Sequence, residues 1–265
     1  MSTSLGAVNA LAATVDGPLD APTLVLGPSL GTDTGLFDVQ VASLAASYRV
    51  VRFDLPGHGR SPTWDEPFLV EDLATAVLRR LDRIGVDRFH YAGVSLGGAI
   101  GQQLAVVSDR LASLTLMATA SRFPDPDAWP ARAELVLASG TEALVPSRYG
   151  TWFTQRYAAA NPAETERLIA MLRSTSPVAY AACCEAIAAF DLRHRLGTIT
   201  VPTLVIAGQD DPATPPDVVR ELANAIPGAA LVTTAGAHLV NIEAADMVAR
   251  SLAAQLAGHG GNSGL

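Results

Sequence analysis

The sequence predicts an α/β fold, with a mostly parallel central sheet, helices on both of its faces and a helical cap. Short apolar segments alternate with amphipathic segments along most of the chain, as expected for strands and helices around a buried parallel sheet. One long stretch, residues 121–196, lacks any convincing strand. The chain has 265 residues, of which 49% are hydrophobic, so it can bury a sizeable core.

The first half of the chain supplies five predicted strands and two predicted helices. Turn residues bound each apolar run, and residues 69–84 repeat apolar side chains at helical spacing from Leu73 to Ile84. The predicted strands are 7–15, 23–27, 48–54, 88–94 and 111–117, and the predicted helices are 69–84 and 96–107. After the cap, the same reasoning predicts strands at 201–207 and 230–234 and helices at 216–225 and 242–256.

Residues 121–196 break the alternation, and we expect them to form a helical cap inserted into one domain. Prolines interrupt this stretch, which also holds eight of the 18 arginines. Its helix-like pieces are 131–138, 164–172 and 179–190. The predicted organisation is a core of residues 1–120 and 197–256, a cap of residues 121–196, and a disordered glycine-rich tail at 257–265.

The charged residues exclude several classes of function. All 18 positive side chains are arginine, because the sequence contains no lysine. Schiff-base chemistry, pyridoxal phosphate anchoring and a phosphate-binding P-loop lysine are therefore excluded. The net charge is −8 and no basic run interrupts it, so we expect neither nucleic acid nor an anionic membrane as a partner.

The two cysteines and the amino terminus predict a cytoplasmic protein. Cys183 and Cys184 are adjacent, so they form no disulfide framework and no metal-ligand spacing, which favours a reducing compartment. Residues 1–11 lack the positive charge that precedes the apolar stretch of a signal peptide. The long uncharged windows contain glycine, glutamine or proline, so we expect no membrane-spanning helix.

Ser95 is the candidate nucleophile. It lies in Gly93-Val94-Ser95-Leu96-Gly97-Gly98, between a predicted strand and a predicted helix. A sharp strand-to-helix turn there would expose the serine hydroxyl above the sheet edge. The flanking glycines fit this turn, because a Cβ would collide with the neighbouring strand and helix. The alternative is an ordinary turn with a helix-capping serine.

A serine hydroxyl needs a base to take its proton, and His238 is the candidate. It follows the last predicted strand, at the edge of the sheet where active sites gather. Asp211, just past the strand 201–207, is the candidate carboxylate to orient the imidazole. Asp210 competes with it, but the fourth place of the Gly208-to-Asp211 turn is the usual one for the acid.

The oxyanion formed during attack needs two backbone amide donors. Leu96, directly after the nucleophile, is the first candidate, and Leu30, in the loop after strand 23–27, is the second. Pro28 in that loop has no amide proton. We expect His58, in Pro56-Gly57-His58-Gly59, to order its turn rather than to act as the base.

The motifs together resemble those of the α/β-hydrolases and, more narrowly, of the 3-oxoadipate enol-lactone hydrolases. The resemblance runs from about residue 8 to residue 256 and is densest at 29–33, 57–59, 93–98, 180–187 and 206–216, with Trp152-Phe153-Thr154 and the Cys183-Cys184 pair its most specific features. The chain departs from the family pattern at Pro28, at Pro56, where an arginine is common, and at Phe37, where a tryptophan is frequent.

The resemblance implies an α/β-hydrolase fold with a helical cap, and a serine enzyme that opens 3-oxoadipate enol-lactone. No metal or organic cofactor is needed for this chemistry. The substrate is an anionic lactone, so one of the cap arginines Arg132, Arg148 and Arg156 is expected to bind its carboxylate. Trp152 is a further candidate substrate contact.

Other functions remain open at this point. A broad carboxylesterase, a perhydrolase or a carbon–carbon bond hydrolase would use the same three residues. A non-catalytic receptor of the same fold is the alternative from another class, although a receptor need not retain Ser95, Asp211 and His238 together. The sequence does not decide whether the chain forms a homo-oligomer.

Overall fold

The computed structural model describes residues 10–258 and contains a seven-stranded sheet of order β1-β3-β2-β4-β5-β6-β7. The strands are β1 Ala13–Asp16, β2 Thr23–Gly27, β3 Arg49–Phe53, β4 Phe89–Val94, β5 Leu111–Met117, β6 Thr203–Gly208 and β7 Ala230–Thr234. Only β1 is antiparallel to its neighbour. The prediction of a mostly parallel sheet is confirmed, although the strand predicted at 7–15 begins only at Ala13 and residues 7–9 lie outside the described part.

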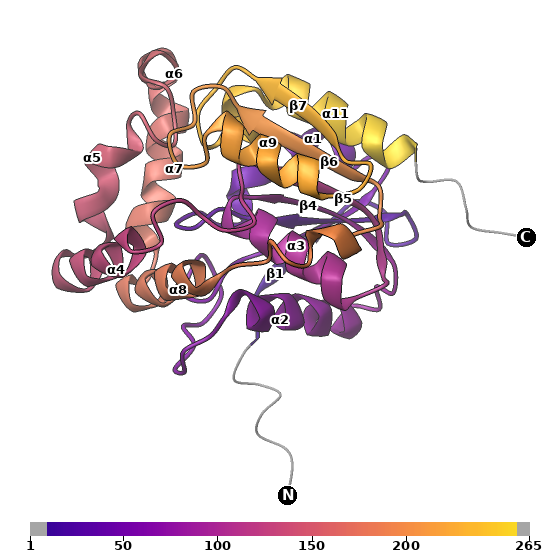
Figure 1. Cartoon of the computed structure of the whole chain (residues 1–265), viewed down its shortest axis with the longest axis horizontal. Helices are drawn as coiled ribbons and strands as arrows, with labels where there is room; N and C mark the ends of the chain where they lie inside the picture. Colours follow the sequence, from indigo (N-terminus) through magenta and orange to yellow (C-terminus); the bar gives the residue numbers. More distant parts are fainter. Residues whose placement is uncertain (1–9, 259–265) are drawn as a thin grey trace, which may run out of the picture.

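Helices cover both faces of this sheet (Figure 1). Helices α1 (Asp38–Leu44) and α11 (Ala245–Ala257) contact one another on one face, and α2 (Val70–Arg83) and α3 (Leu96–Val107) contact one another on the other. Every residue of β2, β4 and β6 is buried, as expected for parallel strands between two helical layers. Helix α9 (Pro216–Ala225) packs on β6 and β7.

Between β5 and β6 the chain forms only helices, turns and one isolated bridge. We call this segment, residues 121–196, the cap. Its helices are α4 Ala128–Ser139, α5 Val145–Arg148, α6 Gln155–Ala160, α7 Pro162–Ser174 and α8 Pro177–Ala189. Figure 1 shows them gathered at one end of the sheet, with α4 packed on α8. Of the predicted tail at 257–265, residues 259–265 lie outside the described part.

The helix predicted at 242–256 is interrupted, which corrects that expectation. Helix α10 (Val240–Glu243) ends at Ala244, whose backbone is not helical (φ −113°, ψ 38°), and α11 then begins. No glycine or proline marks this break. The short helix α1 is also absent from the prediction, because its buried face includes Gln40, whose amide donates to the carbonyl of Asn241 at 2.8 Å. A polar residue on the buried face hides the apolar repeat.

The sheet brings the candidate site residues to one edge. The carboxyl ends of β2, β4, β6 and β7 lead into the loops that carry Leu30, Ser95, Asp211 and His238. Parallel strands place their carboxyl ends at the same edge, where ligands of open α/β sheets usually bind. No helix within residues 10–258 is both long and apolar enough to cross a membrane.

The contact between the β2 loop and the start of α3 tolerates no side chain at Gly97. A Cβ on Gly97 would collide with the carbonyl of Gly27 and lie 2.8 Å from that of Pro28. We therefore predict that Gly97→Ala lowers the free energy of unfolding by about 3 kcal/mol, because backbone atoms must move apart. Chemical denaturation followed by circular dichroism measures this change.

Gly197→Ala is the matched control. No atom lies within 4 Å of a Cβ at Gly197, so its unfolding free energy should stay within about 0.5 kcal/mol of wild type. Equal stabilities of the two variants would contradict the backbone contact at Gly97.

Candidate active site

Ser95 occupies a sharp turn between β4 and α3. Its φ is +57° and its ψ is −115°, a conformation that a residue with a side chain rarely adopts and that costs about 1–3 kcal/mol. Two hydrogen bonds hold the turn on the end of β5: the Ser95 amide donates to the carbonyl of Met117 at 2.9 Å, and the hydroxyl of Thr119 donates to the carbonyl of Ser95 at 2.8 Å. The strained turn predicted from the Gly-x-Ser-x-Gly pattern is therefore present.

Further contacts join this turn to the loop after β2. The Tyr91 hydroxyl donates to the carbonyl of Gly97 at 2.8 Å, and the Gly97 amide donates to the carbonyl of Pro28 at 3.0 Å. The backbones of the turn and the β2 end meet directly, since a Cβ at Gly97 would collide with the carbonyl of Gly27. These contacts bring the loop that carries Leu30 next to Ser95.

The amides of Leu96 and Leu30 remain available as donors. Leu96 is the first residue of α3, so no carbonyl one turn earlier accepts from its amide. In the loop after β2, the neighbouring amides are used: Gly31 donates to Nε2 of His58 at 3.0 Å and Thr32 to the carbonyl of Ser29 at 3.1 Å. Within residues 10–258 no acceptor takes the Leu30 amide.

His58 fixes this loop as a neutral, fully buried ring. Its Nδ1 lies 2.8 Å from the carbonyl of Pro56, which can only accept, and its Nε2 accepts from the Gly31 amide. Burial lowers the pKa of His58 to about 4, because desolvation disfavours the charged ring. His58 thus orders its turn and the adjoining loop, as expected, and it does not line the cavity that contains Ser95.

His238 and Asp211 form a buried pair. Nδ1 of His238 lies 2.8 Å from Oδ2 of Asp211, so a proton on Nδ1 leaves Nε2 free to accept one. Asp211 also accepts from the Thr214 hydroxyl at 2.6 Å and from the amides of Ala213 and Thr214 at 2.8 and 3.1 Å. Burial raises the pKa of Asp211, but His238 and Thr214 outweigh this effect and leave that pKa below its ordinary value.

Asp210 has a different environment. Its side chain is exposed, and its carboxylate accepts from the amide of Gly236 at a long 3.4 Å. Its own amide donates to the carbonyl of Gly236 at 2.9 Å. Of the two neighbouring aspartates, it is Asp211 that contacts the imidazole.

Ser95 and His238 line one cavity of about 160 Å³ under the cap. Leu30 lies in its wall, and the cap contributes Trp129, Trp152 and Tyr180. Among the described residues no direct hydrogen bond joins the Ser95 hydroxyl to the His238 ring. Such bonds are often long in the free enzyme and shorten when substrate binds.

The three cap arginines differ in their placement. Arg148 is 5% exposed and Arg132 half-buried, and both line the cavity with Ser95, whereas Arg156 is exposed on α6 and does not. Arg148 lies 5.5 Å from the centroid of the Trp152 ring and donates to the Ser147 hydroxyl at 3.0 Å. Arg132 lies 4.5 Å over the ring of Trp129.

Neither cavity arginine has a carboxylate partner among residues 10–258, and the Nε of Arg148 is buried without any acceptor. Burial lowers the pKa of Arg148, and the charge of Arg132 lowers it further. Asp125 also lines this cavity, but it forms no ion pair with either arginine among the described residues, and two guanidinium groups without an ion-pair partner favour an anionic ligand.

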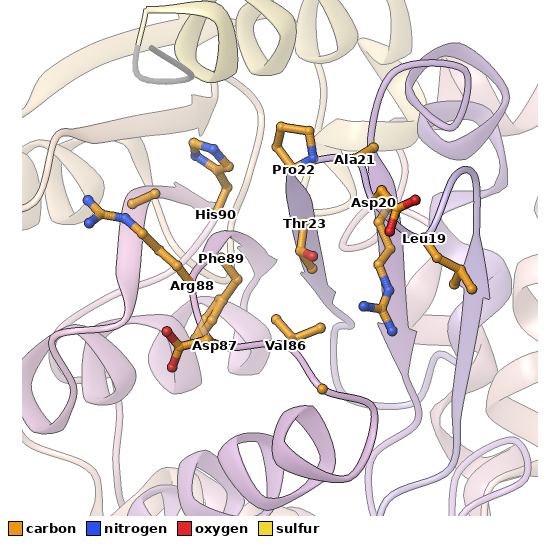
Figure 2. A pocket seen from close by; sticks show the side chains of 13 residues that line it. Leu19, Asp20, Ala21, Pro22, Thr23, Val86, Asp87, Arg88, Phe89 and His90 are labelled. Atoms are coloured by element: carbon orange, nitrogen blue, oxygen red, sulfur yellow. The ribbon is translucent and has the colours of Figure 1, made fainter. Parts of the chain in front are cut away.

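A second cavity, of about 340 Å³, lies at the opposite, amino-terminal edge of the sheet (Figure 2). Figure 2 shows residues 19–23 on one side and residues 86–90 on the other. Its wall combines Asp20 and Asp87 with Arg49 and Arg88, and it contains none of the candidate site residues. The chemistry expected from the sequence belongs to the smaller cavity.

Comparison with known proteins decides the family. Residues 22–245 match the family model of the alpha/beta hydrolase fold. The chain belongs to the α/β-hydrolase family. This α/β-hydrolase is 38% identical over 205 residues to 3-oxoadipate enol-lactonase 1 of Acinetobacter baylyi, covering 77% of each chain.

Two further similar proteins are named for different activities. A protein named as a carbamate hydrolase, RutD, of Pseudomonas syringae is 33% identical over 232 residues, which cover 84% of this chain and 89% of the relative. The crystal structure of the enol-lactonase from Burkholderia xenovorans superposes with a TM-score of 0.91 at 37% identity, covering 93% of this chain and 96% of that one. The resemblance and the fold predicted from the sequence are confirmed, and the protein is a hydrolase of this family.

Several residues of the site of this α/β-hydrolase were not singled out from the sequence. Thr214 contacts Asp211, Tyr180 lines the cavity, and Tyr91 donates to the carbonyl of Gly97 in the turn that carries Ser95. Only Thr214 had a local signal, because threonine three residues after an aspartate often donates back to that carboxylate. Cys184 lies near the two cavity arginines, but burial raises its thiol pKa to about 12. Within the described part of the chain, no three His, Cys, Asp or Glu side chains form a metal-binding cluster.

The contrast between Asp211 and Asp210 predicts very different effects of the same substitution. Asp211→Asn removes the acceptor that fixes the His238 tautomer, so we expect kcat for a p-nitrophenyl ester to fall about 10,000-fold. Asp210→Asn should leave kcat within about threefold of wild type. Steady-state kinetics checks both variants, and similar losses would contradict the assignment of Asp211.

Burial of neutral His58 predicts a pH-dependent stability. Above pH 6.5 the ring is neutral in both the folded and the unfolded chain, so its titration does not affect the free energy of unfolding. Between pH 6.5 and about pH 4 only the unfolded chain takes up the proton, so folding loses about 3 kcal/mol in total as pH falls.

His58→Gln does not titrate, so its unfolding free energy should lack this part of the pH dependence. Chemical denaturation of both proteins at a series of pH values tests the prediction. Parallel curves for wild type and variant would show that His58 titrates normally in the folded protein.

Proposed function

We propose that this α/β-hydrolase opens the ring of 3-oxoadipate enol-lactone to give 3-oxoadipate. The observation that carries the proposal is the pair Arg148 and Arg132, which lack carboxylate partners within residues 10–258 and line the same cavity as Ser95 and His238. A buried guanidinium without a counter-ion is costly, and a substrate carboxylate would relieve that cost. The enol-lactonases among the relatives support this choice of anionic substrate.

In the proposed reaction, Ser95 Oγ attacks the lactone carbonyl carbon while Nε2 of His238 takes the hydroxyl proton. Asp211 accepts from Nδ1 and stabilises the imidazolium that forms. The amides of Leu96 and Leu30 are assigned to the developing oxyanion, and losing one such donor typically costs about 3–4 kcal/mol of transition-state stabilisation.

The ring C–O bond then breaks, and His238 returns its proton to the departing oxygen. Because an enol is a better leaving group than an alkoxide and ketonises after departure, ring opening is irreversible. A water molecule attacks the acyl carbon while His238 accepts its proton. The bond between the acyl carbon and Ser95 Oγ then breaks, and His238 returns the proton to Oγ, which releases the acid and restores the hydroxyl.

The deciding experiment compares enol-lactone, generated in situ, with a neutral p-nitrophenyl ester as substrates of the purified protein. We expect kcat/KM for the lactone to exceed that for the ester by several orders of magnitude. Comparable values would indicate a broad esterase. Preference for a carbamate over both substrates would assign the protein to the chemistry named for its RutD relatives.

The arginine contacts predict a selective effect on the anionic substrate. Arg148→Met should raise KM for the enol-lactone about 10- to 100-fold and leave the neutral ester nearly unchanged, because a hydrogen-bonded charge pair contributes about 1.5–3 kcal/mol. Arg132→Met should have the same direction of effect. Arg156 is exposed, so Arg156→Met is the matched control and should leave KM unchanged for both substrates.

Stability provides an independent readout for Arg148. Since its buried charge has no carboxylate partner among residues 10–258, Arg148→Met should unfold at an equal or higher denaturant concentration than wild type. Unchanged lactone KM in all three arginine variants would remove the carboxylate-binding proposal.

A further inference from the structure

The cap and the loop that carries His238 form one hydrogen-bonded unit. The His238 amide donates to the carbonyl of Thr151 at 3.1 Å, and the Leu239 amide to that of Trp152 at 3.0 Å. The turn that presents these carbonyls begins at Arg148, whose own carbonyl accepts from the amides of Thr151 and Trp152 at 3.1 and 2.8 Å. The candidate base and the buried arginine thus share a continuous backbone framework.

The side chain of Glu243 adds further hydrogen bonds to this framework. It is the last residue of α10 and half-buried, and its Oε1 accepts from the amide of Thr154 at 2.6 Å and from that of Ala237 at 3.2 Å. Its Oε2 accepts from the Thr154 hydroxyl at 2.8 Å. One carboxylate therefore bridges the cap, two residues after Trp152, and the loop residue directly before His238.

Glu243 does not line the cavity that contains Ser95 and His238. Its hydrogen bonds instead satisfy two backbone amides that would otherwise lie unpaired at the junction of cap and core. They are charge-assisted bonds, which are stronger and more directional than neutral ones. This arrangement restrains the loop at Ala237, and hence the position of the His238 ring relative to Ser95.

We propose that Glu243 is a positioning residue, which holds His238 in its reactive position by tying its loop to the cap segment Thr151–Thr154. The inference rests on the proposed reaction of Ser95 with His238, but not on the choice of lactone. Displacement of a catalytic group by about 1 Å can cost 100-fold in rate. Loss of Glu243 should therefore slow chemistry at a correctly folded site.

The test uses Glu243→Met, which retains most of the side-chain volume and removes every acceptor. Active sites are titrated with a fluorophosphonate, with Ser95→Ala as the unlabelled reference, and kcat is expressed per labelled serine for a neutral p-nitrophenyl ester. We expect kcat per site to fall 10- to 100-fold, while KM changes less than about threefold. A role in folding alone would reduce the number of labelled sites without changing kcat per site.

Two matched variants complete the comparison. Glu243→Gln keeps one oxygen that can accept from both amides, so it should retain kcat within about threefold. Asp246→Ala removes an acidic side chain that is exposed on α11, and it should behave as wild type. Unchanged kcat per site in Glu243→Met would overturn the inference, as would equal losses in all three variants.

Hydrogen exchange gives a second test that needs no variant. If the proposal is right, the amides of Thr154, Ala237, His238 and Leu239 exchange as one unit, with similar protection. Exchange at 237–239 that is 100-fold faster than at Thr154 would overturn it. If the fluorophosphonate does not label wild type at Ser95, both the proposed reaction and the inference about Glu243 are wrong. If wild type is labelled but does not hydrolyse the lactone, only the proposed substrate is wrong.

Discussion

The site depends on the direct contact of backbones at the end of β2 and the start of α3. At Gly97 a Cβ would collide with the carbonyl of Gly27, and the Gly97 amide donates to the carbonyl of Pro28. Without a side chain in between, the loop of Leu30 approaches the strained turn of Ser95. Hydrogen bonds at Ser95 to Met117 and from Thr119 offset that strain. The proposed nucleophile and the proposed oxyanion donors are therefore consequences of one packing contact.

Around this contact, buried polar groups fall into two kinds. Asp211 and His58 have their hydrogen-bonding capacity met by neighbours that the fold places beside them. Arg148 keeps a buried Nε without an acceptor and forms no ion pair with a carboxylate among residues 10–258. Burial of a fully paired group requires little free energy, whereas burial of an unpaired charge is unfavourable until a ligand of opposite charge binds. That contrast distinguishes Asp211 and His58, which build the site, from Arg148, which is proposed to bind the substrate.

Local signals explain what the sequence predicted. The turn at Ser95, the strands β5 and β7 and the helices α3 and α9 follow from glycine spacing, proline positions and short-range apolar patterns, and their bounds agree with the prediction or nearly so. The break at Ala244 has no such signal, and neither does the role proposed for Glu243, which depends on hydrogen bonds to residues 6 and 89 positions away. The same reason separates Arg148 from Arg156: burial is a property of the folded cap and not of the local sequence.

The positions at which the chain departs from the enol-lactone hydrolase pattern fit this division. Pro28 and Pro56 contribute carbonyl oxygens, which accept from the Gly97 amide and from Nδ1 of His58. A carbonyl is independent of side-chain identity, so a change at either position leaves the backbone framework in place. Pro56 carries no charge at the position where the resemblance implies that an arginine is common. For the proposed anionic substrate, Arg148 is the buried cation that lines the same cavity as Ser95. Substrate recognition can thus move into the cap while the chemistry stays on the sheet.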